Sequence, residues 1–388
     1  MDSFKRKLQL NLLFLYFILF PLGQFAKFKQ FNLTDLLVLL SLLIFVFTKE
    51  KNYPKSSKEI FFTITVFIFS TIFSVIFFDS QSIKLGIPYL IRFINYLIFY
   101  LAIFDLLKVY PKMKNVLINC LILDGIIVSI LGILQYILLP DLRYLYYFGW
   151  DDHYFRLVST FLDPAFTGII LVLTDILLFS KLKNNKKIAI PLIFIVTTAL
   201  LLTYSRSSFI ALIVSSVFYI LQKNKKVIAL VFPILFLISL PFLPRPSSEG
   251  VKLERTNSIV LKVENYKDSL KLAKLSPIFG IGFDNVCEGK VKILNKNDSF
   301  SSHSCQGLDN SFLFILVTTG LAGILSYLVL GHSLIKGLKK ENLPIVVAAI
   351  SAILIHSLFT NTLFYSWIMG YMAILLGSFS SYQKNNSL

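Results

Sequence analysis

Residues 203–208 (TYSRSS) join two apolar stretches, and Arg206 is the charged residue among them. A single helix over residues 188–222 would be about 52 Å long, which exceeds the ~30 Å hydrocarbon core of a bilayer, so the sequence predicts a turn at Ser205 and Arg206. A guanidinium near the hydrocarbon boundary needs an anionic partner, and its planar fork fits phosphate or carboxylate. Arg206 is therefore either part of an anion-binding site or an interfacial arginine whose head reaches water.

A second polar segment, residues 151–156 (DDHYFR), ends in Arg156 and precedes residues 159–164 (STFLDP). We expect Arg156 at the N-terminal end of the next helix, where exposed backbone donors favour an anion. A metal site at residues 151–153 is disfavoured, because three adjacent side chains cannot all converge on one ion.

Aromatic residues surround this segment. They include Tyr147, Trp150 and Tyr154. These rings either stack on sugars of a glycan or belong to the aromatic belt that marks a membrane interface.

The 67 residues from 244 to 310 form one long polar connection. Residues 257–275 mix apolar and lysine positions in a pattern that predicts an amphipathic helix lying on the membrane, with Arg255 at its entry. Residues 276–283 (SPIFGIGF) then combine a helix breaker with two glycines that allow a close backbone approach to another segment. Cys287 and Cys305 lie in the same connection, where they either form a disulfide that closes a loop of about 19 residues or remain separate thiols.

The last polar segment contains His303 and residues 308–313 (LDNSFL), ahead of an apolar stretch that carries residues 319–323 (TGLAG). Asp309 and Asn310 are positioned to cap the helix that follows. His332 and His356 lie near or within apolar stretches, and we expect both to be structural.

The elements that must position these residues are long apolar stretches. Of the 388 residues, 56% are hydrophobic and 15% are charged, against roughly 25% charged in an ordinary soluble domain, which excludes a soluble enzyme. Twelve apolar stretches approach the roughly 20 residues that cross a bilayer. They cover residues 8–25, 33–48, 60–78, 85–107, 116–139, 160–180, 188–203, 207–222, 227–243, 311–335, 343–360 and 363–382. The sequence predicts an all-α polytopic membrane protein with about 12 transmembrane helices and one long outward loop that contains short amphipathic helices.

The basic residues alternate between the two sides of this predicted topology. If the N-terminus is cytoplasmic, that side carries 21 Lys and Arg residues, whereas the opposite short connections carry six. The positive-inside rule therefore predicts that both termini are cytoplasmic. The net charge of +17 then reflects topology, so nucleic acid is not an expected partner. We divide the chain into nine spans in residues 1–243, an extracytoplasmic loop in 244–310, and three spans with a cytoplasmic tail in 311–388.

Taken together, these segments resemble the O-antigen polymerase and O-antigen ligase superfamily of polytopic membrane glycosyltransferases. The similarity covers about residues 115–380 and rests on four motifs in the order of the family. They are Arg156 with residues 159–161 and Pro164, then residues 203–207, then residues 276–283, and then residues 309–313 with Gly320 and Gly323. Each motif is weak alone, but their order on the outward side of about twelve spans is specific.

The resemblance implies a metal-independent transfer of glycan from an undecaprenyl-diphosphate carrier, without a cofactor, on the outer face of the cytoplasmic membrane. It implies that outward arginines hold the diphosphate, which carries over to Arg156 and Arg206 and less directly to Arg255. Ligases of the family typically have a histidine directly before the asparagine of the fourth motif, whereas here Asp309 takes that place. This departure favours a polymerase and leaves Asp309 and His303 as the candidates for the base.

We therefore expect a polymerase of the O-antigen or capsule type, which transfers the growing glycan to a lipid-linked repeat unit. The alternative within the family is a ligase that passes the polymer to lipid A core or another acceptor. The alternative of another class is a flippase or transporter, which is weakened because the two halves show no matching pair of interrupted spans. The expected partners are the lipid-linked oligosaccharide, membrane lipid and, as is usual for the family, a chain-length regulator and a flippase.

Overall fold

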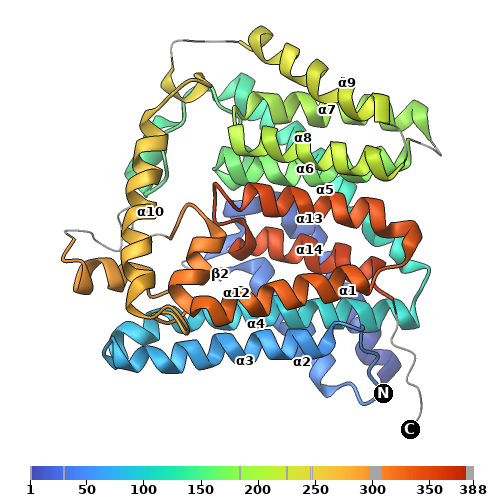
Figure 1. Ribbon diagram of the computed structural model, residues 1–388. Coiled ribbons are helices and arrows are strands. Elements are labelled where there is room, and N and C mark those ends of the chain that lie inside the picture. Colours follow the sequence, from blue (N-terminus) through green and yellow to red (C-terminus); the bar gives the residue numbers. More distant parts are fainter. Residues whose placement is uncertain are drawn as a thin grey trace.

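The computed structural model describes residues 2–28, 31–182, 185–223, 226–244, 246, 248–296 and 307–381. Most helices run roughly parallel to one another, and one helix crosses an end of this bundle (Figure 1). Each predicted apolar stretch coincides with a helix. These helices are α1 (Asp2–Leu19), α2 (Leu33–Phe47), α3 (Ser57–Phe73), α4 (Ser80–Val109), α5 (Met113–Leu138), α6 (Pro164–Lys181), α7 (Lys186–Leu202), α8 (Arg206–Gln222), α9 (Lys226–Ser239), α12 (Ser311–Lys336), α13 (Leu343–His356) and α14 (Ser366–Phe379).

Short elements connect these helices. The strands β1 (Lys27–Phe28) and β2 (Phe31–Asn32) pair antiparallel. The short helical elements are η1 (Phe20–Ala26), η2 (Ser74–Ile76), η3 (Arg143–Phe148), η4 (Ser159–Phe161), η5 (Leu240–Phe242), η6 (Glu249–Val251), α11 (Val286–Glu288), η7 (Gly289–Ile293), η9 (Lys340–Asn342) and η10 (Thr362–Phe364).

The lengths and composition of the helices confirm an all-α polytopic membrane protein. Within the described residues, six helical segments are long and apolar enough to cross a membrane. They are Asp2–Ala26, Ser57–Ile76, Ile83–Val109, Met113–Leu138, Pro164–Lys181 and Ser311–Lys336. The other apolar helices of the bundle have 14 to 17 residues, so the count of about twelve spans stays a prediction.

Contacts between the connections show which of them lie at each end of the bundle. At one end, Arg6 near the start of α1 donates to Asp105 near the end of α4, and the backbone N–H of Asn52 donates to the same carboxylate at 2.8 Å. At the other end, the backbone N–H of Ser311 donates to the carbonyl oxygen of Ser357 at 2.9 Å, and Ser248 donates to Tyr154 at 2.9 Å. The connections that carry these two sets of contacts therefore lie at opposite ends of the bundle.

Helix α10 (Asn257–Leu275) covers the end that carries residues 153–158, 248–256 and 307–311. Its bounds match the predicted amphipathic segment, and it runs across the ends of the other helices and packs on α12 (Figure 1). We call this covered end of the bundle the outer end.

The segment 276–283 leaves α10 and enters the bundle beside α12. The backbone N–H groups of Ile281 and Gly282 donate to the carbonyl oxygens of Val317 and Thr318 at 2.9 and 3.0 Å. In return, Leu321 and Ala322 donate to carbonyl oxygens of residues 277 and 278. Irregular backbone at membrane depth is tolerated where protein surrounds it and satisfies its polar groups.

An aromatic cluster holds this re-entrant segment in place. The ring of Phe283 lies 5.3 Å from Phe67 of α3 and 5.5 Å from Phe314 of α12, measured between ring centroids. Such tilted ring pairs stabilise a core beyond the area that they bury. The close backbone approach predicted for residues 276–283 is therefore a contact with α12.

Candidate functional site

Arg206 stands at the first turn of α8. Helix α7 ends at Leu202 and α8 begins at Arg206, so the predicted turn lies at Ser205, whose hydroxyl accepts from the backbone N–H of Ser208 at 3.4 Å. The guanidinium of Arg206 donates from Nη1 to the carbonyl oxygens of Leu253 and Arg255 at 3.2 and 2.9 Å. The long connection therefore folds back over the start of α8.

Arg156 approaches the same turn from the connection between α5 and α6. Its Nε donates to the carbonyl oxygen of Thr203 at 3.1 Å, and the backbone N–H of Leu157 donates to Leu202 at 2.9 Å. Gly250 lies against this side chain, because an added β-carbon there would be 2.8 Å from Cδ of Arg156. The glycine thus leaves room for the arginine beneath the connection.

Arg255 completes the group. Its Nη1 donates to the carbonyl oxygens of Gly250 and Lys252 at 2.9 and 2.8 Å, and its Nη2 donates to Tyr204 at 3.4 Å. Arg156, Arg206 and Arg255 therefore meet around the α7–α8 turn, and we call these three residues the arginine cluster. All three were predicted from the sequence, although Arg156 and Arg255 are 99 positions apart in the chain.

The arginine cluster concentrates positive charge in a half-buried place. Burial, followed by repulsion from Arg255, lowers the pKa of Arg156 to about 9, and burial with repulsion from Arg206 lowers the pKa of Arg255 to about 10. Both residues therefore remain charged at neutral pH. Among the described residues, no carboxylate forms an ion pair with Arg156 or Arg255. An anionic ligand would relieve this repulsion through charge-assisted hydrogen bonds.

Arg156 lies close enough to the N-terminus of α6 to interact electrostatically with Asp163, the capping residue of that helix, but the first backbone donors of α6 are already occupied. Helix α6 begins at Pro164, eight residues after Arg156, and the carboxylate of Asp163 accepts from the backbone N–H groups of Ala165 and Phe166 at 2.6 and 2.9 Å. A capping carboxylate satisfies the donors that would otherwise bind an anion. The guanidinium groups themselves therefore provide the anion-binding capacity.

His153 lies beside the cluster and was not selected from the sequence. It is buried, and burial, followed by the charges of Arg156 and Arg255, lowers its pKa to about 3. Its Nε2 has no hydrogen-bond partner among the described residues. A neutral imidazole with an unused nitrogen beside an anion site can donate to, or accept from, a bound ligand.

Asp309 lies under α10, directly before the start of α12. Its Oδ1 is 3.5 Å from Nζ of Lys262, and its Oδ2 accepts from Asn265 at 3.4 Å. The side chain of Asn310, rather than Asp309, caps α12 by accepting from Phe312 and Leu313 at 2.8 and 3.0 Å. The carboxylate of Asp309 therefore does not cap α12 and instead contacts residues of α10 at the outer end.

His356 links these two parts of the outer end. Its Nε2 is 3.1 Å from Oγ of Ser207, the residue after Arg206, and its Nδ1 is 2.6 Å from Oγ1 of Thr362. In the segment that follows His356, the carbonyl oxygen of Leu358 accepts from the side-chain N–H of Asn310 at 3.0 Å. The expected structural role of His356 is therefore a connection between the arginine cluster and the start of α12. No sequence signal marked this role, because Ser207 and His356 are 149 residues apart.

Residues 191–328 match the family model described as O-Antigen ligase. The match supports the O-antigen polymerase and ligase superfamily. No curated protein matches the chain. The matched segment includes Arg206, Arg255 and Asp309, while Arg156 and His356 lie outside it.

This superfamily match is shorter than the resemblance expected over residues 115–380, but it includes a large part of the outer end of the bundle. It includes the α7–α8 turn, helix α10, the re-entrant segment and most of α12. The matched segment is therefore similar to O-antigen ligase or polymerase-like membrane enzymes, and this similarity does not distinguish the two activities.

The aromatic residues predicted to bind glycan differ in their exposure and in their neighbours. Tyr147 is 87% exposed, whereas Trp150 lies near Lys27, whose Nζ is 5.4 Å from the indole centroid. Tyr154 packs on Phe155 and lies under the guanidinium of Arg143 at 4.6 Å. Their role in glycan binding stays a prediction.

Two predicted residues, His303 and Cys305, lie outside the described residues. The assignment of His303 as a base and the pairing of Cys305 with Cys287 therefore remain predictions. Cys287 itself is buried in α11, beside the re-entrant segment.

Proposed function

We propose that the protein is a polymerase that joins lipid-linked repeat units on the outer face of the cytoplasmic membrane. The observation that carries this proposal is the arginine cluster, in which Arg156, Arg206 and Arg255 converge at one end of a membrane bundle. A diphosphate has the charge and the oxygen geometry that several guanidinium groups bind together.

The proposed reaction transfers a glycan between two lipid carriers. The bond between the anomeric carbon of the growing glycan and its diphosphate oxygen breaks, and that carbon bonds to a hydroxyl oxygen of the incoming repeat unit. The hydroxyl proton passes to a base, and undecaprenyl diphosphate leaves with the bonding electrons. Guanidinium donors stabilise the negative charge that develops on the leaving oxygen. No metal ion or cofactor enters this scheme.

The base of this scheme is Asp309 or His303. Asp309 is a half-buried carboxylate at the outer end, next to Lys262 and Asn265, and the turn that contacts Asn310 is connected through His356 to the arginine cluster. An aspartate before the asparagine, where ligases have histidine, supports the polymerase over the ligase. We infer that both termini are cytoplasmic and that this site faces the periplasm or exterior.

A ligase is the second candidate, and the matched family description favours it. It would use the same arginine cluster to hold the same donor, but the acceptor would be lipid A core or another terminal molecule. The two activities therefore differ in the acceptor and in the product that accumulates when the protein is absent.

The test compares surface glycan and carrier-linked glycan in cells that lack the protein, with the wild type, Arg156→Ala or Arg206→Ala added back. If the protein is a polymerase, cells that lack it should carry single repeat units on the final acceptor. Both variants should reproduce that profile while the variant protein stays in the membrane. Full-length polymer retained on undecaprenyl diphosphate would establish the ligase. Units trapped in the cytoplasmic leaflet would establish a transporter, and full chain length in both variants would refute the role of the arginines.

A further inference from the structure

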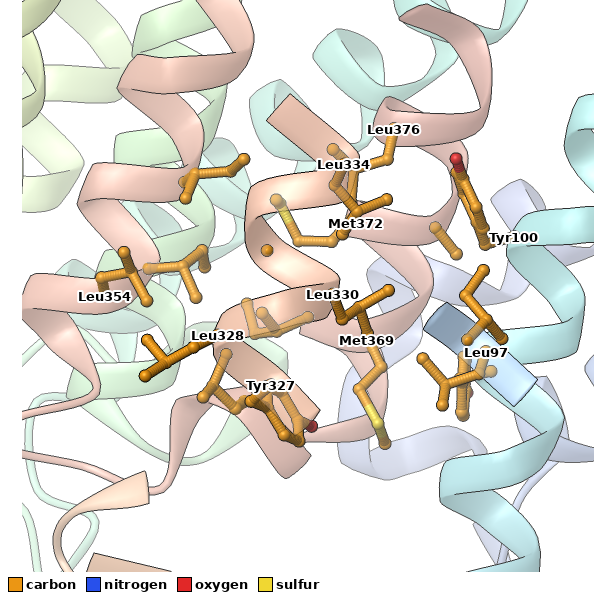
Figure 2. A pocket seen from close by; sticks show the side chains of 18 of the residues that line it. Leu97, Tyr100, Tyr327, Leu328, Leu330, Leu334, Leu354, Met369, Met372 and Leu376 are labelled. Carbon is orange, nitrogen blue, oxygen red and sulfur yellow. The ribbon is translucent and has the colours of Figure 1, made fainter. Parts of the chain in front are cut away.

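Two cavities of the bundle differ in the chemistry of their linings. An apolar cavity of about 380 Å³ lies among α4, α12, α13 and α14, and Figure 2 shows Leu97, Tyr327, Leu354 and Met369 of these helices around it. Another cavity, of about 280 Å³, is lined by lysine, serine and asparagine side chains together with apolar ones. Charged and hydrogen-bonding groups indicate the chemistry of a ligand, so this polar cavity is the more informative of the two.

The polar cavity lies at the end of the bundle opposite the arginine cluster, which we call the inner end (Figure 1). Its lining includes Lys108 near the end of α4, Lys114 near the start of α5 and Lys339 in the connection after α12. We call this cavity the lysine pocket. The backbone N–H of Ser381 donates to the carbonyl oxygen of Gly337 at 2.8 Å, so the segment after α14 is fixed beside that connection.

Three ammonium groups share the lysine pocket. Nζ of Lys114 lies 4.6 Å from the ring centroid of Phe379, and the charge of Lys339 repels both Lys108 and Lys114. Among the described residues, no carboxylate forms an ion pair with Lys114 or Lys339, and none lines the pocket. The exposed carboxylate of Glu341 attracts Lys114 from outside the lining. An anion inside the pocket would therefore relieve the repulsion between the lysines.

Two buried hydrogen-bond donors also line the lysine pocket. Ser378 and Asn342 are 7% and 8% exposed. Neither Oγ of Ser378 nor Nδ2 of Asn342 has a hydrogen-bond partner among the described residues. Buried polar groups are normally hydrogen-bonded, so these two groups indicate that an acceptor enters the pocket.

The charge asymmetry of the topology accounts for lysines at the inner end, but not for the convergence of three of them on one cavity. Lys186 and Lys187 begin α7 at the same end, on the connection from α6, whose Lys181 donates to Asn119 of α5 at 3.0 Å. Neither Lys186 nor Lys187 lines the lysine pocket. Basic pockets between transmembrane helices on the cytoplasmic side are suited to the phosphate groups of anionic lipids.

We propose that the lysine pocket binds a phosphate group, which the three ammonium groups attract and to which Ser378 and Asn342 donate. A phosphate offers several acceptor oxygens to donors that approach from different elements. The group belongs either to the headgroup of an anionic lipid or to a soluble phosphate compound. This inference goes beyond the proposed function, because it concerns the end that we infer to be cytoplasmic and does not depend on the reaction at the outer end.

The experiment measures thermal unfolding of the purified full-length protein in detergent, with phosphatidylglycerol, phosphatidylcholine or inorganic phosphate added at constant ionic strength. We expect phosphatidylglycerol or inorganic phosphate to raise the unfolding temperature of the wild type, because a ligand that binds the folded state stabilises it. Phosphatidylcholine should not, since its choline cation cancels the charge. A rise with phosphatidylglycerol alone would assign the site to a lipid headgroup, and a rise with inorganic phosphate would assign it to a soluble compound.

The lysine variants test whether the pocket is the site. Replacing Lys114 and Lys339 together by alanine should raise the concentration needed for half of the stabilisation about tenfold. Replacing Lys186 and Lys187 together by alanine removes the same charge from the same end and should leave that concentration unchanged. No stabilisation of the wild type by either phosphate source would overturn the proposal, as would equal losses in the two double variants.

Ser378→Ala separates a bound phosphate from a general attraction of anions to lysines. It retains every lysine and removes a buried hydroxyl that has no partner among the described residues. Without ligand, this variant should be at least as stable as the wild type. With ligand, the concentration needed for half of the stabilisation should rise about threefold. An unchanged concentration would refute binding inside the pocket.

Discussion

Gly320 of α12 lies so close to the carbonyl group of Ile278 that a β-carbon at this position would overlap it. Gly320 has a φ of 64°, and Gly280, at a φ of 70°, approaches the backbone of Thr318 in the same way. Helix α12 and the re-entrant segment therefore touch backbone to backbone. This contact fixes the segment that follows α10 against the helix that begins just after Asp309.

Gly320→Ala should destabilise the protein by more than about 2 kcal/mol, because the new methyl group combines a left-handed backbone with a direct overlap. The measurement is thermal unfolding of the purified protein. Gly331→Ala, on the same helix but facing open space, is the control and should be neutral or slightly stabilising. Equal stability of the two variants would contradict the backbone contact.

Arg255→Ala should lower the rate of glycan transfer at least tenfold, because one fixed donor to the developing negative charge is lost. The rate is measured with membranes and a lipid-linked donor. Arg143→Ala is the matched control, since Arg143 is an exposed arginine of the same end that is already paired with Asp141 at 2.7 Å. A comparable loss in both variants would mean that general positive charge, rather than the arginine cluster, matters.

His153 should make the protein less stable in acid. Its pKa is about 3 in the folded protein and about 6.5 when unfolded, so its contribution is complete above pH 6.5 and is lost as the pH falls toward 3. At pH 5 the loss amounts to about 2 kcal/mol. His153→Gln should remove this part of the pH dependence, which is measured as the difference between the two unfolding profiles from pH 7.5 to pH 5. Parallel profiles would show that His153 is not buried in a neutral form.

His356 and Thr362 should be energetically coupled across the outer end. A double-mutant cycle with His356→Ala and Thr362→Val should give a coupling of about 1 kcal/mol in unfolding free energy, because their side chains share a buried hydrogen bond. Ser351 provides the control, since its hydroxyl donates to Ala348 within α13. The cycle of His356→Ala with Ser351→Ala should give less than about 0.5 kcal/mol. Coupling of the same size in both cycles would contradict a specific contact between His356 and Thr362.

The helices themselves were predictable from local sequence. Apolar stretches and breakers located each helix of the bundle, and the predicted bounds of α10 match the structure. The turn at Ser205 followed from a simple length argument, because a longer helix would not fit a bilayer. The start of α6 was placed four residues too early, because residues 160–163 are apolar enough to extend the pattern but Asp163 caps the helix.

The charged residues of the site were predictable from the sequence, but the contacts between the site and distant segments were not. Arg156, Arg206 and Arg255 were recognisable because charge is costly beside long apolar stretches. His153 and His356 were not recognisable, because their burial and their neighbours depend on segments far away in the chain.

The sequence by itself determined that this chain is a helical membrane protein with cationic residues on polar connections, since hydropathy and charge act locally along the chain. Only the tertiary structure decided that three of those arginines meet, that residues 276–283 descend beside α12, and that an apolar cavity lies between α12, α13 and α14. The physical reason is that packing between distant helices chooses which neighbours satisfy each backbone group and which spaces remain unfilled.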